Sequence, residues 1–339
     1  MMDWTKGYKA TWEVLRMNVD AWAPDGKLAN VESFSVSRSC TDAVPLIETA
    51  AMEVDDEFED GWYKLSMIAE QGSVERFDIG VFLFETTGRT HNYGRVTMSA
   101  EGYSVLKPAD DVLMPYGQYA PRGTNGAEMA ASLLRACTPA PIVVDETFTV
   151  DTNVVFSIGM SHLAAAWMLL DAGGFCIQID GDGTIHIMRK PSTPDIELSR
   201  FNASMLMPSV TDDQSVTGVP NRYYAIAEGR IVTAINDSPA SSVSYRNRGR
   251  WVDAVDTSPT PVNGETLEQY AARKLEEAAT ITKKLSYTRE YYPSVRPFSV
   301  VRGSMADIGL DGDMMVLSQS LTCDKGITVQ ETAGQAVRL

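Results

Sequence analysis

Apolar and polar residues alternate along much of the first third of the chain. The alternation covers residues 11–20, 31–38, 61–69, 77–85 and 93–99. Because neighbouring side chains of a β-strand point to opposite faces of its sheet, this period of two predicts half-buried strands. Turn-forming residues stand between them, at Pro24-Asp25-Gly26, Gln71-Gly72-Ser73 and Thr86-Thr87-Gly88, at the short spacing of a meander or barrel. The first 107 residues are therefore predicted to form a β domain.

The pattern changes to helical spacing after residue 107. Residues 126–137 follow Asn125 and carry Glu128, which together have the spacing of a capping box. Residues 162–172 follow Ser161 as N-cap and end at the pair Gly173-Gly174. Two alternating apolar runs between 171 and 191 then predict a hairpin. Helix, helix and hairpin indicate a small α/β domain over residues 108–194.

The joint of this hairpin, Asp180-Gly181-Asp182-Gly183-Thr184, is acidic and rich in glycine, which are features of metal-binding and phosphate-binding loops. A calcium loop of the EF-hand type would need glycine where Ile185 stands and glutamate where Pro191 stands. A phosphate loop would need a following Lys-Ser/Thr and a helix N-terminus, whereas this joint connects strand to strand. The composition favours a tight hairpin turn.

Strand patterns return after Pro194, at residues 195–201, 220–227, 230–236 and 241–255. One long helix is predicted at about 265–285, because Leu267, Ala271 and Leu275 begin an apolar stripe that continues to Leu285. Its glutamates come early and Lys283 and Lys284 come late, an order that suits the helix dipole. Closing strands are predicted at 298–302, 313–321 and 327–332, with turns at 309–312 and 324–326.

Charge limits the classes of partner. The chain of 339 residues has 29 basic and 45 acidic residues and a formal net charge of -16. This charge opposes binding to nucleic acid or to an anionic membrane, so any contact with DNA is expected to be non-adhesive. No stretch reaches the roughly 20 apolar residues of a membrane span. The cysteines Cys40, Cys137, Cys176 and Cys323 stand alone and predict neither a zinc site nor a disulfide framework.

Candidate catalytic residues are few. The histidines, His91, His162 and His186, are predicted on different elements and lack metal-ligand spacing. Ser161 stands in a sequence resembling a nucleophile elbow, but Leu163 occupies the second glycine position, so a capping role is favoured. The acid pairs Asp110-Asp111 and Asp212-Asp213 could serve a glycosidase, although pairs arise by chance in so acidic a chain. We assign no catalytic, metal or cofactor residues.

Two charge clusters have a structural interpretation and a functional one. The acidic run from Glu53 to Asp60 is interpreted as a solvated loop, with a surface facing a basic partner or a DNA channel as the alternative. Arg246, Arg248 and Arg250 are predicted on one side of a strand, where they would protect a sheet edge. Nucleic-acid recognition is the weaker alternative, because no aromatic platform or second basic strand is expected to accompany them.

The order of these elements resembles the tail hub proteins of bacteriophages, also called baseplate hub or tail-associated proteins, over essentially the whole chain. The resemblance rests on TWEVLRMNVD, on YSVLKPADD leading to YAPRGTNGAEMAASLL, on WMLLDAGGFCIQIDGDGTIHI, on PNRYYAIAEG with the late helix, and on YYPSVRPFSVVRG with GLDGDMMVLSQSL. It implies an α+β, mainly β fold of split β-barrel hub domains with an inserted small α/β domain. The expected domains are 1–107 with about 195–236, the insertion 108–194, and 237–339 carrying the late helix.

The resemblance also implies a function. Such hubs form a homotrimeric ring at the distal end of the tail, join the tail tube to the tip, and line the channel for the tape measure protein and DNA. Expected partners are the distal tail or tail tube protein, the tape measure protein, and tip or receptor-binding proteins, with DNA only as cargo. The expected location is the distal tail of the virion, after assembly in the host cytoplasm. No cofactor is expected.

Two alternatives stay open at this point. One is a tail-tip enzyme that degrades the cell wall, a glycosidase that uses paired carboxylates. The other is a module at the tip that binds host carbohydrate. Some larger tail-associated proteins continue into peptidase, lysin or receptor-binding regions, whereas this chain ends at Leu339, soon after the last hub-like strand. We therefore expect no enzymatic tip on this chain, although a partner protein could carry one.

Overall fold

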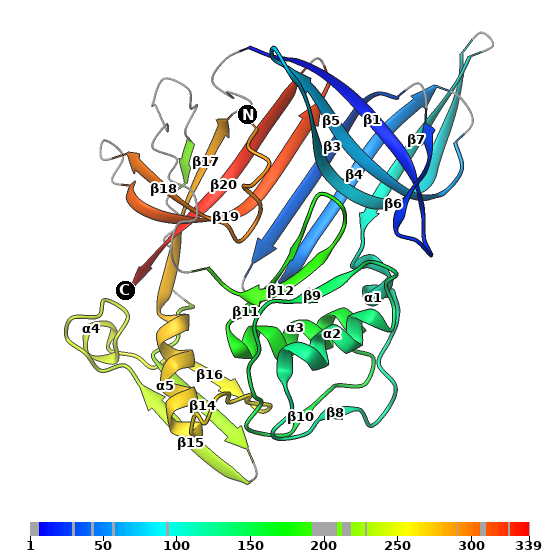
Figure 1. Ribbon diagram of the computed structural model, residues 1–339. Helices are drawn as coiled ribbons and strands as arrows, with labels where there is room; N and C mark the ends of the chain where they lie inside the picture. Colours follow the sequence, from blue (N-terminus) through cyan, green and yellow to red (C-terminus); the bar gives the residue numbers. More distant parts are fainter. Residues whose placement is uncertain are drawn as a thin grey trace.

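A computed structural model describes residues 7–28, 31–41, 44–55, 58–92, 95–191, 209–211, 218–227, 229–289, 291–305, 310–324 and 326–338. Most of the described strands belong to one large antiparallel sheet (Figure 1). The prediction of a mainly β, α+β fold is confirmed. The split into barrels and the domain boundaries stay predictions. No helix within the described ranges has the length and apolar character needed to cross a bilayer.

The large sheet runs in the order β13-β17-β20-β19-β3-β4-β7-β6-β5-β1-β2, with β18 paired to β19. Its strands are β1 (Lys9–Asn18), β2 (Ala23–Leu28), β3 (Val31–Thr41), β4 (Val44–Asp55), β5 (Gly61–Glu70), β6 (Val74–Asn92), β7 (Arg95–Ser104), β13 (Ser209–Thr211), β17 (Thr280–Arg289), β18 (Val300–Met305), β19 (Leu310–Cys323) and β20 (Ile327–Arg338).

The sheet joins the two ends of the sequence. Strands β1–β7 form one curved half and β17–β20 the other, and the halves meet where β3 pairs with β19 (Figure 1). In that pairing Arg38 lies opposite Gln319 and Ser37 opposite Ser320. Each half encloses apolar side chains: Leu65, Phe82 and Phe84 are fully buried in the first half, and Leu285 and Val301 in the second. The C-terminal strands are therefore integral to the sheet that the N-terminal strands begin.

A helical layer lies beside the first half. It consists of α1 (Lys107–Asp111), β8 (Tyr119–Ala120), α2 (Gly126–Arg135), β9 (Ile142–Val144), β10 (Val154–Val155), α3 (His162–Gly173), β11 (Phe175–Ile179) and β12 (Ile185–Arg189). The predicted caps are present, because Asn125 accepts a hydrogen bond from Glu128 N and Ser161 accepts one from Ala164 N. Gly174 ends α3 in the left-handed conformation at φ 72°. The predicted helix pair and hairpin are confirmed.

A second small unit holds β14 (Arg222–Ala227), β15 (Arg230–Ile235), α4 (Tyr245–Arg248), β16 (Asp253–Asp256) and α5 (Leu267–Ala278). Its strands form a sheet of their own in the order β15-β14-β16, so residues 222–235 do not pair with the strands of residues 1–107. Helix α5 packs on one face of this sheet through Tyr270, Ala271 and Leu267.

Two predictions in this region are wrong. The late helix ends at Ala278, and residues 280–289 form β17, which pairs with β20 along its whole length. The β-branched residues Thr280, Ile281 and Thr282 favour a strand, and the partner strand decides the outcome. Arg246 and Arg248 lie on the short helix α4, which Ser244 caps and Gly249 ends at φ 66°, and not on a strand.

Three further predictions need correction. The predicted turn at residues 24–26 lies inside β2, and the predicted turn at residues 86–88 is a bulge within β6. Strand β4 was not predicted, and it contains the start of the acidic run, Glu53 to Asp55. The predicted strand at 195–201 lies outside the described residues.

Candidate functional site

The acid pairs show no catalytic geometry in the described part of the chain. Asp110 and Asp111 are exposed at the end of α1. Asp110 accepts a hydrogen bond from Ser161 Oγ at 3.2 Å, and Asp111 forms an ion pair with Lys107. Both carboxylates thus hold α1 and the start of α3 in place. The pair Asp212-Asp213 lies outside the described residues.

Ser161, His162 and His186 occupy structural positions, and His91 is exposed near the end of β6. Ser161 caps α3, as predicted, through a 3.1 Å bond from Ala164 N. The His162 ring lies 2.9 Å from the Val112 carbonyl oxygen. His186 lies between two carboxylates, with Nδ1 3.3 Å from Asp145 and Nε2 3.1 Å from Asp180. Within the described ranges, no group of three or more His, Cys, Asp or Glu side chains is arranged to hold a metal ion.

The glycine-rich joint is the tight turn that its sequence predicts. Gly183 N donates to the Asp180 carbonyl oxygen at 3.0 Å, and Gly183 has φ 85°. Asp182 Oδ1 accepts from Thr184 N at 3.0 Å. The Asp182 carboxylate thus stabilises the turn in the way that Asp side chains commonly do, whereas Asp180 contributes its backbone carbonyl and its carboxylate contacts His186.

The same turn has a second role that its sequence did not reveal. It docks the helical layer onto the first half of the large sheet. A Cβ atom at Gly181 would lie 2.0 Å from the Asp78 carbonyl oxygen on β6, so only glycine allows this approach. Trp22 Nε1 donates to the Asp182 carbonyl oxygen at 3.0 Å, and the Trp22 ring meets Trp62 edge-on at 5.7 Å. Trp22 and Asp182 are 160 residues apart, so no local sequence pattern could predict this docking contact.

A groove of about 740 Å³ separates α3 from the small sheet and α5. Leu163, Trp167 and Met168 line its α3 side. On the opposite side Asp256 accepts hydrogen bonds from Tyr270 Oη at 2.6 Å and Tyr223 Oη at 3.3 Å. Burial, followed by the nearby Asp256 carboxylate, raises the pKa of Tyr223 to about 12. Burial and the hydrogen bond to Asp256 also raise the pKa of Tyr270 above its ordinary value. Both phenols therefore keep their protons at neutral pH and act as hydrogen-bond donors.

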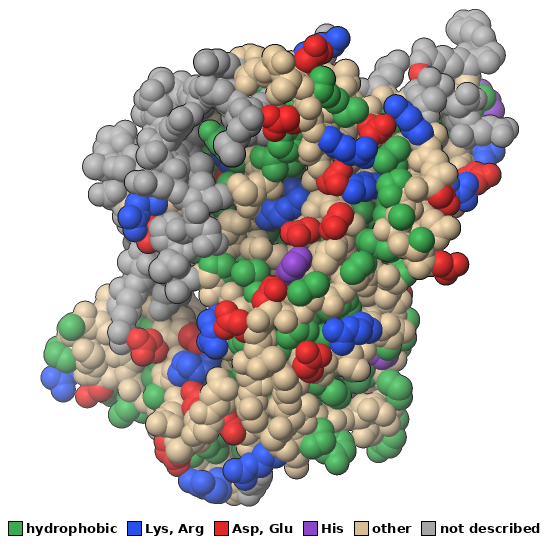
Figure 2. Space-filling model, viewed as in Figure 1, with side chains coloured by type: hydrophobic (Ala, Val, Ile, Leu, Met, Phe, Trp, Pro, Cys, Tyr) green, Lys and Arg blue, Asp and Glu red, His purple; other side chains and the backbone are tan. Residues whose placement is uncertain are grey.

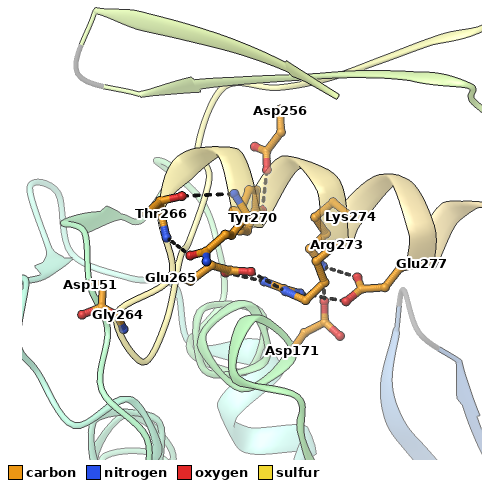
Figure 3. A network of polar contacts seen from close by, with 11 residues as sticks. Asp151, Asp171, Asp256, Gly264, Glu265, Thr266, Tyr270, Arg273, Lys274 and Glu277 are labelled. Atoms are coloured by element: carbon orange, nitrogen blue, oxygen red, sulfur yellow. Dashed lines mark hydrogen bonds and ion pairs between the residues drawn. The ribbon is translucent and has the colours of Figure 1, made fainter. Parts of the chain in front are cut away.

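The groove's charged groups bind the two helices together. Figure 3 shows Asp171 of α3 below Lys274 of α5, and their charged atoms are 3.8 Å apart. Lys190 Nζ donates to the other oxygen of Asp171 at 2.9 Å. Arg273, in the middle of α5, donates to both oxygens of Glu265, which precedes that helix, at 2.9 and 3.0 Å. The Lys274–Asp171 pair connects α5 to α3, whereas the Arg273–Glu265 pair stabilises the start of α5 itself. Asp171 and Glu265, carboxylates of the type a hydrolytic mechanism would need, are thus paired with basic side chains.

A row of buried polar side chains crosses the middle of the large sheet. Its members lie opposite one another on five neighbouring strands, in the order Tyr287 (β17), Glu331 (β20), Gln319 (β19), Arg38 (β3) and Glu48 (β4). Each is at most 4% exposed. We call this set the buried polar row. It spans the junction of the two sheet halves.

Hydrogen bonds and ion pairs connect the row from end to end. Glu331 accepts from Tyr287 Oη at 2.5 Å and from Gln319 Nε2 at 2.7 Å, and it forms a bidentate pair with Arg289 at 2.7 Å. Arg38 Nη1 donates to Gln319 Oε1 at 3.3 Å, and Arg38 Nε lies 3.0 Å from Glu48 Oε1. Burial raises the pKa of Glu48 against the opposing effect of Arg38. Buried charges of this kind are tolerated only when they are paired.

An exposed apolar surface lies on the small sheet, opposite α5. It consists of Ile231, Ile235 and Val255, which are 65%, 58% and 60% exposed. Beside it, Trp251 stacks on Tyr245 at 4.2 Å between ring centroids, and the Arg222 guanidinium lies 4.8 Å from the Trp251 ring centre. Aliphatic, aromatic and arginine side chains together are typical of the centre of protein interfaces. We call this surface the apolar patch.

Comparison with known proteins was made by sequence and by structure. No protein-family model and no curated protein sequence matches the chain. Among solved structures, a tail protein from Neisseria meningitidis superposes with a TM-score of 0.65 at 12% identity, covering 97% of both chains. The 43 kDa tail protein of prophage MuSo2 from Shewanella oneidensis gives 0.61 at 13% identity, covering 97% of this chain and 98% of that one. A prophage tail protein from Listeria monocytogenes gives 0.56 at 10% identity, covering 96% and 94%. The resemblance to phage tail proteins inferred from the order of elements is therefore confirmed at the level of the fold, which this chain shares with them from end to end.

Proposed function

We propose that the protein is a structural hub of a bacteriophage tail. In this proposal three copies form a ring at the distal end of the tail, join the tail tube to the tip, and surround the channel through which the tape measure protein and DNA leave. The β-rich parts at the two ends of the sequence would form the ring, with residues 108–194 as an insertion beside it. The observation that carries the proposal is the shared fold with tail proteins over nearly the whole of each chain.

Three features of the molecule support an assembling, non-catalytic role. The apolar patch offers exposed aliphatic and aromatic surface of the kind that subunit contacts bury. The buried polar row connects the two sheet halves through hydrogen bonds, so a mechanical load on one half is transmitted to the other. The carboxylates of the α3–α5 groove are engaged in contacts between structural elements, which favours a structural role over hydrolysis.

Multi-angle light scattering of the full chain at micromolar concentration, alone and with its neighbouring tail proteins, tests the proposal. We expect a trimer or a multiple of it. Replacing Ile231 and Ile235 by Asp should weaken assembly, because it puts charge into an apolar contact. The matched control is Val74→Asp, since Val74 is 67% exposed and lies at the start of β6, far from the patch in sequence. A chain that stays monomeric with all partners present would refute the proposal.

A label on this chain in electron micrographs of intact particles tests the location, which we expect to be the tail tip. Zymography on host cell wall tests the wall-degrading alternative. Lysis that disappears on replacing one acid pair would favour the enzyme. Saturable binding of the isolated chain to host polysaccharide would favour the carbohydrate-binding alternative.

A further inference from the structure

One face of the large sheet differs from the rest of the described surface. On the strands that carry the buried polar row, the residues between the inward-pointing ones face outward and are uncharged and mostly hydroxylated. They are Ser286 and Thr288 on β17, Thr328, Gln330 and Thr332 on β20, Ser318, Ser320 and Thr322 on β19, Ser35, Ser37 and Ser39 on β3, and Ile47, Thr49 and Ala51 on β4. We call this surface the hydroxyl face.

The hydroxyl face is continuous across the junction of the two halves. Thr288, Gln330, Ser320, Ser37 and Thr49 form one row of directly paired residues across five strands. Ser286, Thr332, Ser318 and Ser39 form a second row beside it. Two shallow hollows, of about 400 and 270 Å³, lie along these strands, and Glu101 and Tyr103 of the neighbouring β7 help to line the smaller one. The face is thus a broad surface built by both ends of the chain.

The outward charges of these strands lie at the margins. Glu53 and Asp55 flank the face on β4, Asp313 lies beyond it on β19, and Lys284 lies at the far edge on β17. On the neighbouring strand β7, Glu101 lies opposite Ala51 and borders the face. The other end of the same sheet is different, because Arg76 pairs with Glu13 at 2.8 Å and Lys64 with Asp78 at 2.5 Å. Charges of both signs are also interspersed over the side of the molecule seen in Figure 2. An ordinary solvated sheet surface in this protein therefore carries charges throughout, whereas the hydroxyl face has them only along its margins.

The composition is also poor for a subunit contact. Protein interfaces are enriched in aromatic residues, Met and Arg, and serine is depleted in them. Serine is not a strong strand former either, so strand propensity does not account for Ser35, Ser37 and Ser39 in alternate positions. Hydroxyl groups bond to water about as well as to other partners, and without cations they give phosphate no ionic site. Such a surface stays hydrated and holds neither DNA nor an extended protein chain.

We infer that the hydroxyl face is the wall of the channel, turned toward passing DNA and tape measure protein. The inference rests on the proposed ring and assigns the surface that faces its axis. An anionic polymer moves along an uncharged, hydrated wall without a bound state that would slow it, and the overall charge of -16 adds repulsion. The buried polar row behind the face keeps its five strands in one register, so the wall stays even.

Cysteine labelling of the assembled ring tests the assignment. Cys40, Cys176 and Cys323 are buried, so Cys137→Ala gives a background without the partly exposed thiol. Ser37→Cys and Ser320→Cys probe the face, and Ser132→Cys on α2 and Ser73→Cys at a turn are exposed controls. The assembled ring is treated with a biotin maleimide and then with streptavidin, a protein too wide for a channel that admits a DNA duplex. We expect positions 37 and 320 to react with the maleimide but to exclude streptavidin, whereas the controls bind it.

Each other outcome is decisive. If positions 37 and 320 bind streptavidin as well as the controls do, the hydroxyl face lies on the outside of the ring. If their thiols do not react even with the small maleimide, the face is buried between copies. Either result overturns the assignment and leaves the ring standing. A chain that forms no ring overturns the proposed function itself.

In a second measurement, the ring with Ser37→Arg and Ser320→Arg should bind DNA with a steep salt dependence. Equal binding by the unaltered ring would contradict a non-adhesive wall.

Discussion

Replacement of Glu331 by Gln should sharply destabilise the protein. Glu331 accepts four hydrogen bonds, from Arg289 twice, Tyr287 and Gln319, and its side chain is fully buried. The amide of Gln fills the same space but carries no charge, so the Arg289 guanidinium, 6% exposed, loses its counter-ion. Removing one partner of a buried ion pair costs about 3–5 kcal/mol, because the remaining charge stays buried and uncompensated.

The chain contains a matched control for burial. Arg302 and Asp313 form the same bidentate pair across β18 and β19, at 2.8 and 3.2 Å, but their side chains are 55% and 36% exposed. Asp313→Asn should therefore leave the unfolding midpoint almost unchanged, since water solvates the remaining Arg302. Both are bidentate pairs between neighbouring antiparallel strands, but Arg302 lies directly opposite Asp313, whereas Arg289 reaches Glu331 diagonally. The two pairs differ mainly in burial and in the two further hydrogen bonds that Glu331 accepts from Tyr287 and Gln319.

Urea unfolding followed by tryptophan fluorescence measures both variants. We also expect the double variant Arg289→Met with Glu331→Leu to recover much of the stability lost in Glu331→Gln, because it removes the stranded charge along with its partner. Equal midpoint shifts for Glu331→Gln and Asp313→Asn would refute the reasoning. A double variant no more stable than Glu331→Gln would show that lost hydrogen bonds, and not the unpaired charge, dominate.

Three other predictions follow from individual contacts. Gly181→Ala should lower the free energy of unfolding by about 1–3 kcal/mol, because the added Cβ would overlap the Asp78 backbone. The control Gly88→Ala has open space around it and should leave that free energy nearly unchanged in the same unfolding assay. Partial burial tends to raise the pKa of Asp78, but hydrogen bonds from Lys64 and Ser66 outweigh it and lower the pKa below its ordinary value. The stability that Asp78 contributes is thus present at neutral pH and is lost as the pH falls below about 4, so Asp78→Asn should flatten the pH dependence of the unfolding midpoint in that range. Burial raises the pKa of Cys176 to about 12 and raises that of Cys323 as well, so iodoacetamide at mildly alkaline pH should modify the less buried Cys137 first; rapid native-state modification of Cys176 would contradict its burial.

Much of the fold was predictable because the strands keep a period of two and the helices carry their own caps. Strand β4 was missed for a physical reason. Its buried positions include Glu48 and its exposed positions include Ile47, at 49%, so its hydropathy does not follow its burial. The end of α5 was misplaced because apolar spacing continues past Ala279, while pairing with β20, which is distant in sequence, makes that segment a strand.

The candidate surfaces were less predictable than the fold. Arg38 donates to Gln319, 281 residues away, and no local pattern links them. The serines of β3 were recognised as part of an alternating strand, but their continuation in β19, β20 and β17 depends on register. Asp110 and Asp111 lie at the end of α1, and Arg246 and Arg248 lie on α4. The roles of these side chains depend on helix caps and ion pairs, which their spacing in the sequence does not specify.

The two faces of the central strands depend on each other. Strand register is weakly specified where the side chains of one face are alike, because a slip of two residues replaces one hydroxyl by another. On the hydroxyl face, Ser35, Ser37 and Ser39 could pair with β19 in several registers at similar free energy. The buried polar row removes that ambiguity: Arg38 finds Glu48 and Gln319 only in the observed register, and any slip would bury an unpaired guanidinium. The outer face of these strands can therefore be uniform, because the buried polar contacts on the opposite face specify the strand register.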